Sequence, residues 1–199
     1  PAKILILKRI KPNTLQHEIT QTGPLLDAQG RPAQKGWARN LLLRYDRKAI
    51  KASSWRIKEW DYYCILEKDF GIALTVADNS YLSLIAVNVF DFINHTETTD
   101  MVIIPFTMGK LNMPSSSSEG DIVIGHKKVN LSFRHKDGKR QLDVDFPSFH
   151  KGKGLKGSFT LTPQNQDSMV IVTPFKDDPL AFYYNQKINC LAAEGAFVF

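Results

Sequence analysis

The stretch KEWDYYCILEKDFGIALTVADNSY, residues 58–81, predicts two apolar strands joined by a polar turn. In its first half, period-two alternation places Trp60, Tyr62, Cys64 and Leu66 on one face and Asp61, Tyr63 and Ile65 on the other. Both faces are apolar except at Asp61, so we expect this strand to be covered on both sides. A carboxylate buried there must be paired, protonated or used in chemistry.

Apolar runs separated by Gly, Pro, Asn and Asp continue beyond this stretch to the end of the chain. The predicted strands are 55–66, 71–77, 81–93, 101–107, 121–125, 128–136, 139–146, 155–162, 168–174 and 196–199. They predict a mainly β, antiparallel fold with few helices, either a lipocalin-like barrel or a curved β-sandwich. Residues 37–50 fit a helix or a bent strand end, and both alternatives stay open.

The pair Asp137-Gly138 predicts a tight hairpin turn, because both central positions of a type I′ turn need positive φ. The register that follows places Phe133 opposite Leu142. One face of the hairpin is then apolar and the other polar, as a half-buried antiparallel pair requires.

The composition fits one substantial core, since 43% of the 199 residues are apolar and 23% are charged. Residues 1–36 are rich in turn formers and predict a loop-rich N-terminal segment, followed by a β-barrel-like domain over 37–199. The net charge of +6 permits a nucleic-acid partner, but the basic residues mostly alternate with acids. We therefore expect a solvated basic surface and no nucleic-acid partner.

Cys64 and Cys190 are the only cysteines, and the five histidines show no ligand spacing. Neither a disulfide framework nor a zinc site is expected, and no cofactor motif is present. The apolar run at residues 4–7 is too short for a signal-peptide core or a membrane span. These patterns favour a cytoplasmic protein.

Asp61 and Asp78 are the candidate catalytic residues, since both lie in or at the end of apolar strands. A carboxyl group in an apolar pocket has a raised pKa and can act as a general acid near neutral pH. The structural alternatives are that Asp61 pairs with Arg56 or Lys58, and that Asp78 and Asn79 form an Asx turn.

Four blocks carry a resemblance to a known family: GPLLDAQGRPAQKGWAR (23–39), KEWDYYCI (58–65), LTVADNSY (74–81) and PFKDDPLAFYYNQKIN (174–189). In this order they resemble the bacterial family known as domain of unknown function 2804, a remote relative of carotenoid hydratases of the hydroxyneurosporene synthase type. The resemblance implies a calycin fold with lipocalin-like barrels in tandem. This chain would then be the first half of a longer architecture.

The positions that match the family blocks are Trp60, Asp61, Tyr62, Asp78, Tyr81, Tyr184, Asn185 and Lys187. The two aspartates are our candidate catalytic residues and the other six our candidate ligand contacts; the resemblance adds weight to the aspartates without assigning them a catalytic role. A hydratase-like relative would need an acid in a water-poor cavity to protonate an alkene.

Three functions remain open. The leading one is a module that binds an apolar or lipid-like small molecule in a barrel cavity. The second is a hydratase or isomerase type of enzyme, in which a buried aspartate protonates an unsaturated substrate. The third is a structural or interaction domain that docks a C-terminal half or forms a homo-oligomer, which an exposed apolar patch near residues 197–199 would favour. The lack of a recognised catalytic spacing weighs against an enzyme.

Overall fold

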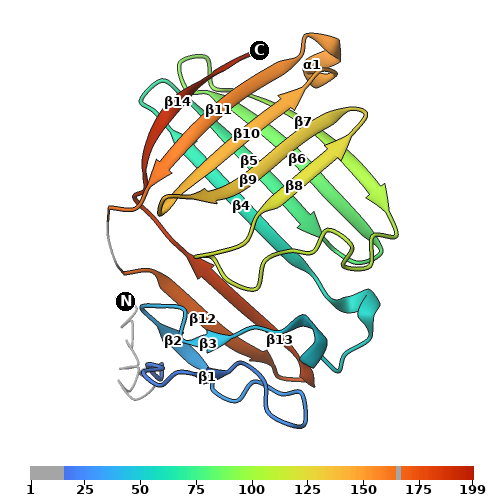
Figure 1. Cartoon of the computed structure of the whole chain (residues 1–199), viewed down its shortest axis with the longest axis vertical. Coiled ribbons are helices and arrows are strands. Elements are labelled where there is room, and N and C mark those ends of the chain that lie inside the picture. Colours follow the sequence, from blue (N-terminus) through green and yellow to red (C-terminus); the bar gives the residue numbers. More distant parts are fainter. Residues whose placement is uncertain (1–15, 165–166) are drawn as a thin grey trace, which may run out of the picture.

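The computed structural model describes residues 16–164 and 167–199, so the first fifteen residues of the predicted loop-rich segment, with the apolar run at 4–7, lie outside the described residues. The described part of the chain is mainly β, with one short helix, α1 (Phe149–Gly152), and short 3-10 turns at Arg47–Ala49 and Ser54–Arg56 (Figure 1). The strands are β1 (Gly23–Pro24), β2 (Gly36–Ala38), β3 (Leu43–Arg44), β4 (Glu59–Leu66), β5 (Phe70–Asp78), β6 (Leu82–Asp91), β7 (Thr96–Pro105), β8 (Ile122–His126), β9 (Val129–Lys136), β10 (Lys139–Phe146), β11 (Leu155–Thr162), β12 (Met169–Phe175), β13 (Asp178–Lys187) and β14 (Ala192–Val198).

Strands β4 to β7 form a four-stranded antiparallel meander. Its register places Tyr63 opposite Leu74, and Leu74 opposite Val87. Because side chains alternate between the faces of a strand, the matching residues of neighbouring strands build one apolar layer on one side of this sheet.

A five-stranded antiparallel sheet has the order β14-β11-β10-β9-β8. The hairpin predicted at Asp137-Gly138 joins β9 and β10, and both turn residues have positive φ, 52° and 72°. Phe133 lies opposite Leu142, so the predicted register is confirmed. Local turn chemistry and strand alternation agree here, which explains why the sequence specifies this pairing.

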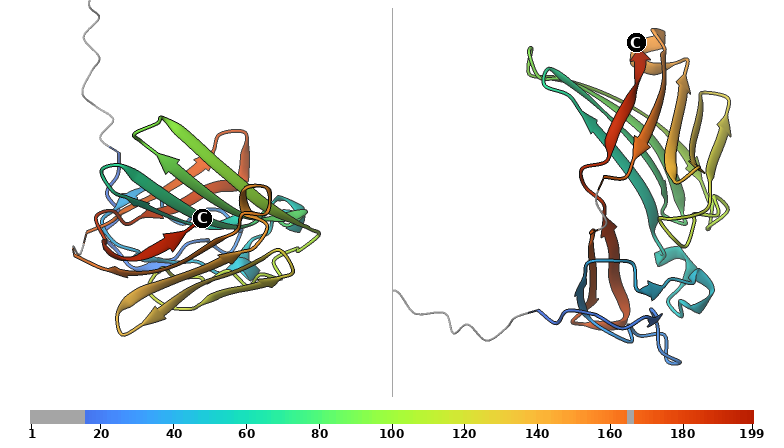
Figure 2. Two further views of the ribbon diagram at one scale, coloured as in Figure 1. Left: turned by 90° about the horizontal axis from the view of Figure 1, so that it is seen from above. Right: turned by 60° about the vertical axis from the view of Figure 1, so that its left-hand side comes forward.

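These two sheets face each other across one hydrophobic core, to which β5 to β11 all contribute buried side chains. Figure 2 shows the green strands of one sheet opposite the yellow and orange strands of the other. Neither sheet closes into a barrel, because β4 and β14 each pair with a single neighbour. At one end the two sheets meet through side chains, with the ring centroids of Phe70 and Phe197 5.8 Å apart. The mainly β, antiparallel prediction is confirmed, and the closed-barrel alternative is wrong for the described residues.

A three-stranded sheet, β13-β12-β2, lies beside this pair of sheets together with the short parallel pair β1-β3 (Figure 1). It has a core of its own, which includes Ile19, Leu25, Leu43, Val170 and Val172. The predicted loop-rich segment thus supplies strands, and residues 37–50 form short strands and a 3-10 turn rather than a helix. Strand β13 was not among the predicted strands.

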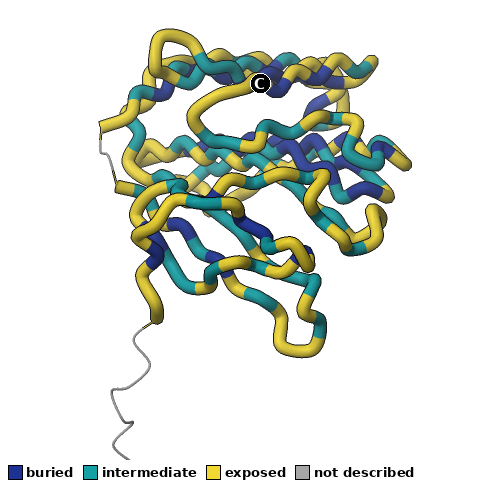
Figure 3. Tube along the Cα trace, turned by 60° about the horizontal axis from the view of Figure 1, so that its bottom comes forward, coloured by how far each residue is buried: buried dark blue, intermediate teal, exposed yellow. Residues whose placement is uncertain are grey.

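One face of β4 is solvent-exposed, contrary to the prediction that both faces are covered. Its side chains Trp60, Tyr62 and Leu66 are 39%, 54% and 63% exposed, whereas Tyr63 and Ile65 on the other face pack against the core. Figure 3 shows this alternation of buried and exposed residues along the strands. The sequence pattern could not show that only one face meets a second sheet.

Candidate functional site

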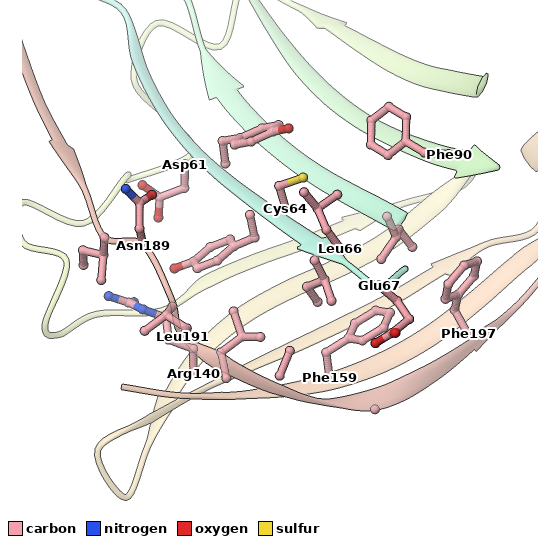
Figure 4. Close-up of a pocket in the computed structure, with 18 of the residues that line it drawn as sticks. Asp61, Cys64, Leu66, Glu67, Phe90, Arg140, Phe159, Asn189, Leu191 and Phe197 are labelled. Atoms are coloured by element: carbon pink, nitrogen blue, oxygen red, sulfur yellow. The ribbon is translucent and has the colours of Figure 1, made fainter. Parts of the chain in front are cut away.

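A cleft of about 1310 Å³ lies along the unpaired edges of β4 and β14. Its apolar walls come from both large sheets and from the segment that leads into β14, and they include Ile65, Phe70, Phe159, Leu161, Leu191 and Phe197. Figure 4 shows Phe159, Leu191 and Phe197 along one wall, with Asp61 and Arg140 in the same cleft. The cleft therefore combines a large apolar surface with a few polar side chains.

Strand alternation turns Asp61 toward the inside of the cleft, since it shares a face of β4 with Tyr63 and Ile65. Among the described residues its carboxylate has no hydrogen bond and no ion pair. The predicted partners lie elsewhere: Arg56 pairs with Asp178 at 2.6 Å, and the ammonium group of Lys58 lies over the ring of Tyr81.

Burial raises the pKa of the Asp61 carboxyl above its ordinary value. The positive charge of Arg140, and to a smaller extent His135, opposes this shift and lowers the pKa in part. Because burial is the larger effect, the carboxyl group holds its proton to a higher pH than an exposed aspartate would.

Arg140 is a residue of the cleft that we did not predict. Its guanidinium lies 5.8 Å from the centre of the Tyr63 ring, and its Nη1 is 3.3 Å from Nδ1 of His135. The hairpin register could have identified Arg140, because it lies two residues before the inward-facing Leu142 and so shares its face of β10. A charged residue on the apolar side of a hairpin is a candidate for function or for a buried pair.

Asp78 has a different setting from Asp61. Its carboxylate is completely buried, and it accepts hydrogen bonds from the backbone N–H of Ser80 at 2.9 Å, the hydroxyl of Thr107 at 3.0 Å and the backbone N–H of Leu111 at 3.4 Å. The bond to Ser80 is the predicted Asx turn. Asp78 is not among the residues that line the cleft, so we assign it a role in holding the 106–111 loop against β5.

The predicted ligand-binding residues divide between two neighbouring pockets. Trp60, Tyr62, Asn185 and Lys187 line the cleft, and the ring of Trp60 lies 5.9 Å from that of Tyr183. A second pocket, of about 760 Å³, lies between β4 and β13 and is lined by Tyr81 and Tyr184.

Trp60, Asp61 and Asn185 line both pockets, so the two cavities meet beside Asp61. Tyr184 is held in the wall by a hydrogen bond of 2.6 Å from its hydroxyl to the carbonyl of Leu43, and burial raises its pKa to about 12. Oδ1 of Asn185 is the one buried side-chain polar atom of the described residues that lacks a hydrogen-bond partner. An unsatisfied acceptor at this junction is available to a ligand that donates a hydrogen bond.

A partly buried polar network, which the sequence analysis did not predict, borders the second pocket. The hydroxyl of Tyr45 donates to Glu59 at 2.6 Å, and Arg47 forms an ion pair with the same carboxylate. Arg47 also donates to the hydroxyl of Ser80 at 3.2 Å, which links this network to Asp78. Glu59 is therefore satisfied within the protein, unlike Asp61.

Within residues 16–164 and 167–199, no group of three or more His, Cys, Asp or Glu side chains could hold a metal ion. In the same part of the chain, no helix has the length and apolar composition needed to cross a membrane.

The sequence model of the family described as "Domain of unknown function (DUF2804)" matches residues 16–199. The chain belongs to this family. The resemblance found in the four sequence blocks is thereby confirmed, while the match carries no information on a kinship with carotenoid hydratases. No curated protein and no solved structure matches the chain. The cleft of this DUF2804 chain therefore has to be interpreted from its own chemistry.

Proposed function

We propose that this DUF2804 chain binds an apolar or lipid-like small molecule in the cleft beside β4 and β14. The observation that carries the proposal is the size of the cleft, about 1310 Å³, together with its aromatic and aliphatic walls. Small-molecule sites are concave and mostly apolar, with a few polar groups that orient the ligand. Asp61, Arg140 and Asn185 are such groups here. A ligand held between curved antiparallel sheets is also what a calycin relationship would imply.

Native mass spectrometry before and after organic extraction tests this function. We expect an additional mass on the purified protein that extraction removes. Ala193→Trp would place an indole ring in the cleft, because Ala193 lies opposite the inward-facing Leu161. Ala192→Trp is the matched control, since Ala192 lies opposite Thr162 on the other face of β14 and does not line the cleft.

The expected result is loss of the bound mass in Ala193→Trp and its retention in Ala192→Trp. A wild-type protein that carries no extra mass, and that takes up no apolar compound when one is offered, would contradict the proposal. Equal effects of the two tryptophans would show that the ligand lies elsewhere.

A second candidate function is a hydratase-like enzyme with Asp61 as the general acid. It is favoured by the position of this carboxyl group in an apolar cleft and by its raised pKa. Asp61 would give its proton to one carbon of an alkene, water would add to the cation that forms, and a proton of that water would return to the carboxylate. Aromatic rings such as Tyr63 would stabilise the cation.

Titration of the Asp61 carboxyl by NMR separates this enzyme from a simple binding module. A midpoint well above 4 supports a role as an acid, and Asp61→Asn should then abolish hydration of an unsaturated substrate without preventing its binding. A midpoint at or below about 4, the value of an exposed aspartate, would remove the acid from the mechanism.

An interaction role is favoured by the exposed apolar face of the four-stranded sheet. Cross-strand pairing aligns Tyr62 with Met101 and Trp60 with Ile103, and these four side chains are 39–55% exposed. Contiguous apolar surface of this kind is typical of an interface, here with a C-terminal half or a second copy. Sedimentation tests the second copy: self-association that Ile103→Ser abolishes would support it, and a monomer at all concentrations would exclude it.

A further inference from the structure

We propose that the ligand of the cleft is an amphiphile with an anionic head group, a carboxylate, which Arg140 binds. This inference rests on the proposed apolar-ligand function and specifies the chemistry of its polar end.

Arg140 stands apart from the other arginines of the described residues. Five of these arginines have a carboxylate within ion-pair distance: Arg31, Arg39, Arg47, Arg56 and Arg134. Arg44 has no such pair but is exposed. Arg140 is half-buried and faces the cleft, yet no carboxylate of the described residues reaches ion-pair distance from it.

The two groups in direct contact with Arg140 carry no negative charge, and the Asp61 carboxyl acts on it only from beyond ion-pair distance. The two contacting groups are the aromatic ring of Tyr63 and Nδ1 of His135. The guanidinium cannot lose its proton in a protein, so its charge is permanent, and burial of an unpaired charge is unfavourable. A ligand carboxylate would remove this cost, and the planar guanidinium matches its two oxygens.

The acidic residues of the cleft do not cancel the attraction of Arg140 for an anionic ligand. Glu67 and Glu194 are exposed and Asp91 is half-exposed, so solvent and salt screen their charges. The Asp61 carboxyl interacts electrostatically with Arg140, and burial, which raises its pKa, favours the protonated form that does not repel an anion. A protonated Asp61 would donate a hydrogen bond to the bound carboxylate.

The apolar part of the ligand would lie against the wall formed by Phe159, Leu161, Leu191 and Phe197. Figure 4 shows this wall continuing from Arg140 and Leu191 to Phe159 and Phe197. The matching chemical class is a long-chain carboxylate, with the charged end at Arg140 and the hydrocarbon chain along the aromatic residues.

Isothermal titration at pH 7 with dodecanoate, dodecanol and dodecylammonium tests the head group at constant tail length. We expect dodecanoate to bind about tenfold more tightly than dodecanol, the difference that one charge-assisted hydrogen bond provides, and dodecylammonium to bind most weakly. Arg140→Met should remove the preference for dodecanoate and leave the affinity for dodecanol within about twofold, because it replaces the apolar stem of the arginine and removes its charge.

Arg134→Met is the matched control. It removes the same charge from the same hairpin, but Arg134 pairs with Asp143 on the other face and does not line the cleft. The control should keep the preference for dodecanoate.

Equal binding of the three probes, tightest binding of the amine, or a carboxylate preference that survives in Arg140→Met would each overturn the anionic head group. Failure of all three probes to bind wild-type protein would instead contradict the proposed apolar-ligand function. The wild-type series decides the question even if Arg140→Met does not fold.

Discussion

Asp78→Ala should destabilise the protein strongly, although it changes no residue of the cleft. The substitution removes a completely buried carboxylate that accepts three hydrogen bonds. It leaves the N–H of Ser80 without its acceptor in a region that water does not reach, and the hydroxyl of Thr107 keeps only its 2.6 Å contact with the hydroxyl of Ser83. The loop at 106–111 also loses its attachment to the end of β5.

The magnitude follows from the geometry of these bonds. Those from Ser80 and Thr107 have normal lengths of 2.9 and 3.0 Å, whereas the one from Leu111, at 3.4 Å, is long and adds little. A hydrogen bond to a charged group contributes about 1.5–3 kcal/mol, so the two strong bonds together contribute about 3–6 kcal/mol. Because a domain is stable by only about 5–15 kcal/mol, this change removes a large share of the total.

Urea unfolding at pH 7, followed by tryptophan fluorescence, measures the loss. Asp78→Asn should lose less than Asp78→Ala, because the amide keeps one acceptor oxygen. Asp145→Ala is the control: its carboxylate is 43% exposed and pairs with Lys156 at 3.5 Å, so its removal should cost less than about 1 kcal/mol. If Asp78→Ala were as mild as this control, the structural role of Asp78 would be refuted.

The remaining predictions concern Asp61 and Gly195. Burial raises the folded-state pKa of Asp61, so ionisation of this carboxyl group destabilises the fold. Asp61→Asn should therefore increase the free energy of unfolding at pH 7, and this gain should vanish as the pH falls below about 4. Urea unfolding at several pH values measures the change. Gly195→Ala should lower stability by more than about 1 kcal/mol, because φ is +157° and a Cβ would overlap the carbonyl oxygen of Ser158. Gly125→Ala is the control: its Cβ would meet only Oδ1 of Asn130, at 3.9 Å, so it should not lower the melting temperature measured by circular dichroism.

Strands and tight turns were predictable because their signals are local. The pair Asp137-Gly138 has the positive φ values that its turn type needs, and strand alternation on either side fixes the same register. The predicted strands from β4 to β12 match observed strands closely, apart from the ends of each element. The structure brings Asn185 to the same two pockets as Trp60 and Asp61, and the functional role of these residues stays a prediction.

The buried face of each strand was not predictable, because alternation defines two faces without showing which of them meets the core. Long-range strand pairing was not predictable either. The exposed side of β4 is as apolar in sequence as the buried side. Strand β2 pairs with β12, so that Ala38 lies opposite Val170. These residues are more than 130 positions apart in the sequence, and no local pattern specifies such a contact. The surroundings of Arg140 were not predictable for the same reason, because its contact with Tyr63 joins two different sheets.

Asp61 and Asp78 have similar sequence surroundings, and their different neighbours in the fold explain why only one of them is available for function. Both lie on the inner face of the four-stranded sheet, Asp61 opposite Val76 and Asp78 opposite Glu59. Asp78 ends a strand with a neighbour on each side, where the 106–111 loop supplies donors for its carboxylate. Asp61 lies on an edge strand, and the edge beyond it opens to the cleft without a paired strand. A partly buried carboxyl group to which no described residue donates a hydrogen bond can interact with a ligand, and this is why we propose Asp61, rather than Asp78, as the functional aspartate.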